Sequence, residues 1–145
     1  MSDNAGSLNR FIEAQNGLYD EIVRELKDGK KVTHWMWYVF PQIAGLGHSA
    51  TAKFYAIQDL SEAQRYQLHP ILGERLLECT KIVVSLKNRT AREIFGDVDA
   101  IKFRSSMTLF MSLSGIDSVY RRAIDQYFDG EPDQKTRDIL SKLQC

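Results

Sequence analysis

The feature that most constrains the fold is an apolar stripe in the middle of the chain. Its members are Leu72, Leu76, Cys79, Val83 and Leu86, which recur at intervals of four, three, four and three residues. An α-helix has about 3.6 residues per turn, so these intervals place all five side chains on one face. The sequence therefore predicts an amphipathic helix that buries this face in a hydrophobic core.

Helical spacing also covers most of the remaining chain. A first helix is expected from Leu8, and a second helix, capped by Asn16, is expected to end at Gly29. The later helices are expected to begin at Ser61, Pro70, Thr90, Asp97 or Asp99, Ser118 and Asp133. The pattern predicts an all-α, single compact domain over residues 1–145, built from about seven short helices, with residues 1–6 disordered at its start.

The segment Val32–Phe40 is apolar on both faces and contains both tryptophans, Trp35 and Trp37. Its residue types favour a strand, but the chain shows no second convincing strand that could satisfy its backbone. We therefore expect a short helix or a buried turn that ends at Pro41. In either conformation the domain packs around this Trp-rich core segment.

Three single positions carry specific expectations. Ile101 is expected to lie in the core with its neighbours on the helix that ends at Leu113. His69 precedes a helix start, where its neutral ring could accept a backbone N–H. Gly73 interrupts the helical pattern and costs about 1 kcal/mol relative to alanine, which indicates that another backbone or side chain packs closely there.

Composition excludes several classes of protein. The chain has 145 residues, of which 43% are hydrophobic, and this is typical of a packed domain rather than a disordered protein. Nineteen basic residues balance nineteen acidic ones, whereas a nucleic-acid or anionic-membrane partner would favour a basic excess, so neither partner is expected. The two cysteines and three histidines show no metal-ligand spacing, so no metal or cofactor is expected.

The cysteines and the N-terminus also bear on localisation. Cys79 lies on the apolar stripe and is expected to be buried, reduced and slow to react, whereas Cys145 is expected to be free and exposed. The first nine residues have no apolar signal region, and the longest strongly apolar run, Trp35–Phe40, is too short to span a bilayer. These features predict a cytoplasmic protein.

Two segments, His34–Gln42 and Lys102–Thr108, mix polar with large apolar residues. Such a mixture is typical of a pocket with an aromatic wall and a few polar groups that orient a ligand. The candidate ligand-binding residues are His34, Trp35, Trp37, Gln42, Lys102, Ser105 and Ser106. In the alternative interpretation the tryptophans belong to the core, Lys102 pairs with a carboxylate such as Asp99, and the serines bond the backbone. No catalytic residue is assigned, because a lysine beside helical serines is a weak sign of a nucleophile–base pair.

Several of these segments together resemble a known protein family. They are His34–Gln42, Gly45–Gly47, His69–Leu76, Ile94–Gly96 and Asp99–Phe110. As a set they resemble the domain-of-unknown-function family 1810 over roughly Leu8 to Leu140. The resemblance implies an all-helical fold and favours a helix within Val32–Phe40. Family members are sometimes labelled calpastatin-like, but calpastatin is a disordered inhibitor, and this composition indicates a packed domain.

The polar motif residues of that family in this chain are His34, Gln42, Lys102, Ser105, Ser106 and Thr108. Two functions remain open. The first is a binding protein or enzyme for a small polar ligand that is nucleotide-like, such as a nucleotide or an ADP-ribose derivative. The second is a non-catalytic protein-interaction or regulatory module, for which an exposed apolar patch above about 600 Å² would be the sign.

Overall fold

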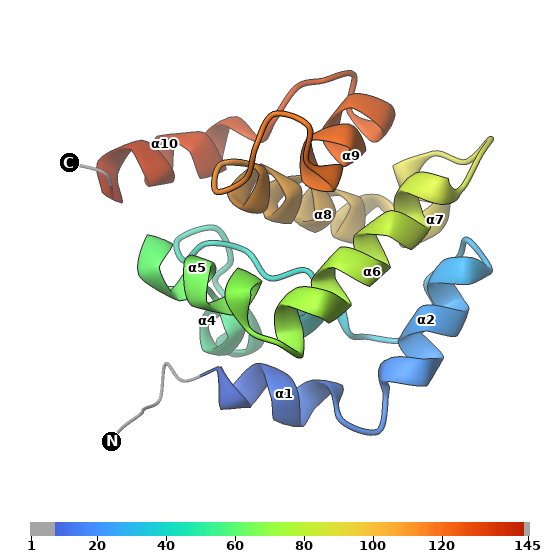
Figure 1. Ribbon diagram of the computed structural model, residues 1–145, viewed down its shortest axis with the longest axis horizontal. Helices are drawn as coiled ribbons and strands as arrows, with labels where there is room; N and C mark the ends of the chain where they lie inside the picture. Colours follow the sequence, from blue (N-terminus) through green and yellow to red (C-terminus); the bar gives the residue numbers. More distant parts are fainter. Residues whose placement is uncertain (1–7, 144–145) are drawn as a thin grey trace.

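The computed structural model describes residues 8–143, which fold into helices joined by short loops (Figure 1). The expected disorder of residues 1–6 lies outside the described residues. Ten helices are present within 8–143, and seven of them have seven or more residues. The helices are α1 (Asn9–Gln15), α2 (Tyr19–Lys27), α3 (Met36–Val39), α4 (Ala50–Tyr55), α5 (Leu60–Leu68), α6 (Leu72–Ser85), α7 (Ala91–Phe95), α8 (Asp97–Met111), α9 (Val119–Tyr127) and α10 (Gln134–Leu143).

Two long helices, α6 and α8, organise the structure. The first packs against α2, α5 and α9, and the second packs against α3, α5, α7, α9 and α10. Figure 1 shows α6 crossing the centre of the molecule, with α8 and α9 above it and α1 below. Because α9 contacts both α6 and α8, it joins the two groups of helices around one core. The chain is therefore an all-α, single compact domain, as its helical spacing predicts.

The apolar stripe forms the buried face of α6, as the spacing predicts. Leu72, Leu76, Cys79 and Val83 are each at most 1% exposed. The helix ends at Ser85, so Leu86, the last member of the stripe, lies at the C-cap position and not within the helix. Burial of the three aliphatic members on this face contributes roughly 1.5–3 kcal/mol each to the hydrophobic driving force for folding.

The corner between α5 and α6 explains Gly73. A Cβ atom built on this residue would lie 2.0 Å from the carbonyl oxygen of Gln67, so the predicted close approach of another backbone is confirmed. The Nδ1 atom of His69 accepts hydrogen bonds from the backbone N–H groups of Ile71 and Leu72 at 3.0 and 3.2 Å, also as predicted. The helix itself begins at Leu72, so the expectation that it begins at Pro70 was wrong.

Helix caps were predicted with mixed success. The Thr90 capping box is present in full, since its side chain and that of Glu93 each accept the other's backbone N–H. Asp59, two residues before the expected Ser61, caps α5 by accepting from a backbone N–H at 2.8 Å. Asn16 ends α1 instead of starting α2. Several polar residues near a helix start can each accept from its free backbone N–H groups, and the local backbone conformation decides which of them does so.

The Trp-rich segment folds as a short helix, α3, which confirms the helical interpretation. Trp35 is 2% exposed, and its ring lies 6.2 Å from that of Phe40. Phe40 in turn meets Phe103 edge to face at 5.0 Å, which joins the segment to α8. Trp37 is only half-buried. The segment therefore contributes one tryptophan to the core and one to the surface.

Ile101 differs from its expected place, because its side chain is 63% exposed. Phe103, Met107 and Phe110 form the buried face of α8, and Ile101 lies away from that face. Residues 8–143 contain no helix that is both long and apolar enough to cross a membrane.

Candidate functional site

A pocket of about 400 Å³ opens between the segment that leads into α3 and the start of α8. Residues between positions 31 and 37 line one side of it, and residues between positions 95 and 102 line the other. This volume lies within the usual range for small-molecule sites. Among the candidate residues, the pocket brings together His34, Trp37 and Lys102.

The start of α8 forms one wall because of a glycine. Gly96 has φ +85°, a conformation that glycine adopts more easily than other residues, and it occupies the N-cap position of α8 without a side-chain cap. The expectation that Asp97 or Asp99 caps this helix was therefore wrong. Instead, both lie in its first turn, where negative charge is favourable to the helix dipole. The first backbone N–H groups of α8 are left without a cap at the pocket wall.

Asp99 lies between two lysines, but it pairs with them unequally. Its carboxylate is 2.8 Å from the Lys31 ammonium, whose side chain is only 6% exposed. The Lys102 ammonium is more distant, at 3.5 Å. Because the shorter pair already neutralises much of the carboxylate charge, Lys102 keeps more capacity for another anionic partner.

The Lys102 ammonium is also held by an aromatic ring. It lies 4.5 Å from the centre of the Trp37 indole, within the range of a cation–π interaction. The side chain of Lys102 is 22% exposed, so the contact leaves part of the ammonium accessible. The arrangement presents an oriented positive charge beside a half-buried flat ring at the pocket wall.

His34 is the third candidate in the pocket. It is exposed, and its backbone carbonyl accepts a 3.3 Å hydrogen bond from the Tyr38 hydroxyl. Within residues 8–143 its imidazole ring makes no hydrogen bond to another side chain or to the backbone. Both ring nitrogens are therefore available for a ligand.

Glu25, a buried residue of α2, fixes the segment that carries Lys31 and His34. Its carboxylate accepts hydrogen bonds from the backbone N–H groups of Val32 and Thr33 at 2.8 and 3.1 Å, and from the Thr33 hydroxyl at 2.7 Å. Burial alone would raise the pKa of Glu25, but these bonds and one from an indole outweigh it and lower the pKa to about 2. Glu25 is therefore ionised at neutral pH.

The remaining candidates lie outside this pocket. Trp35 is buried behind it, and its indole N–H donates to Glu25 at 2.9 Å. The Gln42 carbonyl accepts from the backbone N–H of Ile57 at 2.8 Å, and its half-buried side chain does not line the pocket. Two more candidates, Ser105 and Ser106, are buried within α8 and likewise do not line the pocket.

The two serines differ in their hydrogen bonds. Ser105 donates from its hydroxyl to the carbonyl of Ile101 at 3.1 Å, one turn earlier on the helix, as the structural interpretation expected. Ser106 is fully buried, and its hydroxyl has no hydrogen-bond partner among the described residues. Neither hydroxyl is placed to react with a molecule in the pocket.

Sequence reasoning did not select Lys31 or Gly96 as pocket residues, nor Glu25, which fixes the segment that carries Lys31. No spacing marks Lys31 as the main partner of Asp99, because the two lie on separate segments. Gly96 follows a capping box and precedes a helix, and this pair of signals could have identified it.

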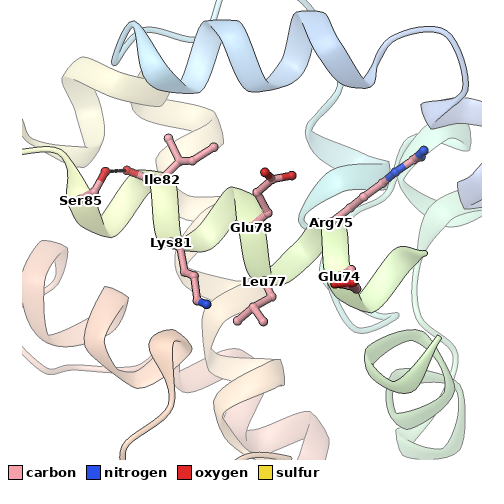
Figure 2. A pocket seen from close by; sticks show the side chains of 7 residues that line it. All are labelled: Glu74, Arg75, Leu77, Glu78, Lys81, Ile82 and Ser85. Atoms are coloured by element: carbon pink, nitrogen blue, oxygen red, sulfur yellow. Dashed lines mark hydrogen bonds between the residues drawn. The ribbon is translucent and has the colours of Figure 1, made fainter. Parts of the chain in front are cut away.

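Two larger depressions lie elsewhere. One, of about 680 Å³, lies between α8 and the start of α10, and one of about 580 Å³ lies on the outer face of α6 (Figure 2). Within the described part of the chain, no group of three or more His, Cys, Asp or Glu side chains could hold a metal ion.

Comparisons with known proteins identify relatives of the whole domain. The family model described as "Protein of unknown function (DUF1810)" matches residues 5–140. The crystal structure of the conserved hypothetical protein Rv1873 from Mycobacterium tuberculosis is similar to this structure, with a TM-score of 0.90 and 43% sequence identity. The match covers 92% of this chain and 96% of that one. No curated protein matches the chain. Since the family model spans nearly the whole chain, the protein belongs to the DUF1810 family.

Proposed function

We propose that the protein binds a small polar ligand with a flat ring and one anionic group, a nucleotide-like molecule, in the pocket between segment 31–37 and α8. The single observation that carries the proposal is the position of Lys102. Its ammonium is held over the Trp37 ring at 4.5 Å and is only loosely paired with Asp99 at 3.5 Å. A positive charge fixed beside a flat apolar surface suits a ligand that combines a ring with an anion.

The other groups of the pocket support the same ligand class. The accessible part of the Trp37 indole would pack against the ring, and the Lys102 ammonium would pair with the anionic group. The uncapped N–H groups at the start of α8 and the imidazole of His34 add hydrogen-bond donors at the pocket walls. Asp97 is directed into an ion pair with Arg92 at 2.8 Å, which reduces its repulsion of an anion.

The geometry favours binding over catalysis. A serine activated by Lys102 would have supported nucleophilic chemistry, but the hydroxyls of Ser105 and Ser106 lie inside the helix packing and outside the pocket. The proposed role is therefore that of a ligand-binding protein.

The experiment is a calorimetric titration with AMP, which carries one flat ring and one phosphate. The wild-type protein is expected to bind it, and Lys102→Ala is expected to weaken binding roughly 10- to 100-fold, since a hydrogen bond to a charged group contributes about 1.5–3 kcal/mol. Trp37→Leu retains an apolar side chain but removes the ring, and it should also weaken binding.

Lys87→Ala is the matched control, because Lys87 is an exposed lysine that does not line the pocket. It should bind AMP as the wild type does. Absence of AMP binding by the wild-type protein, or equal binding by Lys102→Ala, would contradict the proposal.

A further inference from the structure

The outer face of α6 carries a second surface, independent of the pocket described above. Its exposed residues follow helical spacing and comprise Glu74, Leu77, Glu78, Lys81 and Ser85. They border the depression of about 580 Å³ that Figure 2 shows. Leu77 is 37% exposed, so an apolar side chain lies open to solvent at the centre of a charged helix face.

Two of the charged groups near this face are already engaged by α2. The Tyr19 hydroxyl donates a hydrogen bond to Glu78, and the Arg75 guanidinium lies 4.6 Å from the centre of the Tyr19 ring. Arg75 also donates to Gln15 at 3.1 Å. In Figure 2 the side chains of Arg75 and Glu78 point toward the same side of α6, away from Leu77.

Glu74 and Lys81 are different, since neither forms an ion pair with another residue in the described range. They are seven residues apart, about 10.5 Å along the helix, so they lie nearly two full turns from each other on one side. Leu77 lies between them, three residues from Glu74 and four from Lys81. The row formed by Glu74, Leu77 and Lys81 thus has a negative end, an apolar centre and a positive end, while Glu78 points away from Leu77 and is bonded to Tyr19 (Figure 2).

This order of groups is complementary to itself. When two copies of α6 pack antiparallel about a two-fold axis that passes near Leu77, Glu74 of one copy faces Lys81 of the other, and the reverse pair forms at the same time. The two leucines meet near the axis and lose their contact with water. Such an isologous interface is typical of two-fold symmetric dimers.

From this complementarity we propose that the protein associates with a second copy of itself through the outer face of α6. The helix has 14 residues and is about 21 Å long, so it supplies less surface than the roughly 800 Å² per partner of a standard interface. The dimer is therefore expected to dissociate on dilution and to weaken as salt screens its ion pairs.

The experiment measures mass by sedimentation equilibrium at low ionic strength over a range of protein concentrations. The wild-type mass is expected to rise from 16.6 kDa toward twice that value as concentration increases. Glu74→Lys makes both ends of the face positive, and Lys81→Glu makes both ends negative. Each variant alone should therefore stay monomeric, because like charges oppose each other across the axis.

An equimolar mixture of the two variants supplies the decisive result. The positive face of Glu74→Lys is complementary to the negative face of Lys81→Glu at both ends, so the mixture should form a heterodimer with at least the wild-type affinity. Lys135→Glu is the control, since it changes an exposed charge on α10, away from α6. This control should dimerise as the wild type does.

A wild-type mass that remains at 16.6 kDa at every concentration would overturn the proposal. A wild-type dimer with a mixture that stays monomeric would also overturn it, because the interface would then lie elsewhere. Circular dichroism of each variant confirms that a lost dimer does not reflect a lost fold.

Discussion

The indole N–H of Trp35 donates a 2.9 Å hydrogen bond to the carboxylate of Glu25, ten residues earlier in the chain. This bond joins the hydrophobic core to the segment that lines the pocket, because the same carboxylate also holds the backbone of Val32 and Thr33. The carboxylate is buried, so these hydrogen bonds stabilise its charge in place of water.

Glu25→Gln is expected to lower the free energy of unfolding by about 2–3 kcal/mol, because a neutral amide oxygen accepts hydrogen bonds more weakly than a carboxylate oxygen, and an N–H₂ group replaces the oxygen that accepts from the Thr33 hydroxyl. Urea denaturation followed by circular dichroism measures the change. Tryptophan emission should also shift, since the indole N–H of Trp35 then donates to a neutral acceptor in place of a charged one.

Glu21→Gln serves as the comparison on the same helix. Glu21 pairs with Arg24 at the surface, where side chains are well exposed and ion pairs contribute little. Its variant should unfold at nearly the wild-type urea concentration. An equal decrease in the free energy of unfolding in the two variants would contradict the claim that burial makes the hydrogen bonds of Glu25 important for stability.

Acid should weaken the fold through the same carboxylate. The folded-state pKa of Glu25 is lowered to about 2 from an ordinary value of 4.5, so its contribution is complete above about pH 4.5 and is lost as pH falls toward 2. The shift corresponds to roughly 3 kcal/mol at neutral pH. Urea denaturation at several pH values should show stability decreasing over this window, and Glu25→Gln should remove much of the decrease.

Gly73→Ala is expected to destabilise the protein by about 2 kcal/mol or more, because the new Cβ would lie 2.0 Å from the Gln67 carbonyl oxygen. At an unhindered helical position the same change would stabilise the helix by up to about 1 kcal/mol, so the sign of the effect is informative. Gly115→Ala is the control, since nothing lies within 4 Å of its Cβ position. A stable Gly73→Ala variant would show that the corner between α5 and α6 relaxes easily.

The thiol of Cys79 should react slowly in the native protein. It is fully buried, and burial raises its pKa to about 12, so almost none of it is thiolate at neutral pH. Cys145 lies outside the described residues. Because its thiol would also react with the reagent, the measurement uses the Cys145→Ser variant, in which Cys79 is the remaining cysteine. Thiol titration should show little reaction until urea unfolds the protein, and rapid native labelling would contradict the buried position.

Local patterns predicted much of the fold because their physical causes are local. The Thr90 box and the stripe from Leu72 to Val83 each depend on residues within a few turns, and both are present as expected. Ile101 shows the limit of this reasoning. Helical spacing assigns residues to a face, but only packing against α3, α9 and α10 decides which face of α8 is buried.

The pocket was harder to predict than the fold. His34, Trp37 and Lys102 could be selected as polar and aromatic neighbours of a buried segment, and the structure brings them together. Asp99 was a foreseeable partner for Lys102, one turn away, but Lys31 comes from a segment nearly 70 residues earlier. A pair that forms only in the tertiary structure leaves no periodic signal in the sequence.

The ligand proposal is tested most directly by the two indole N–H signals in a proton–nitrogen NMR spectrum. The chain has only two tryptophans, so one signal reports the pocket and the other reports the core behind it. On titration with AMP, the Trp37 signal should shift progressively to saturation, while the signal of Trp35, hydrogen-bonded in the core, should move much less. In Lys102→Ala the Trp37 shift should require roughly 10- to 100-fold more AMP. A Trp37 signal that stays in place at saturating AMP would contradict the assignment of this pocket as a nucleotide-like binding site.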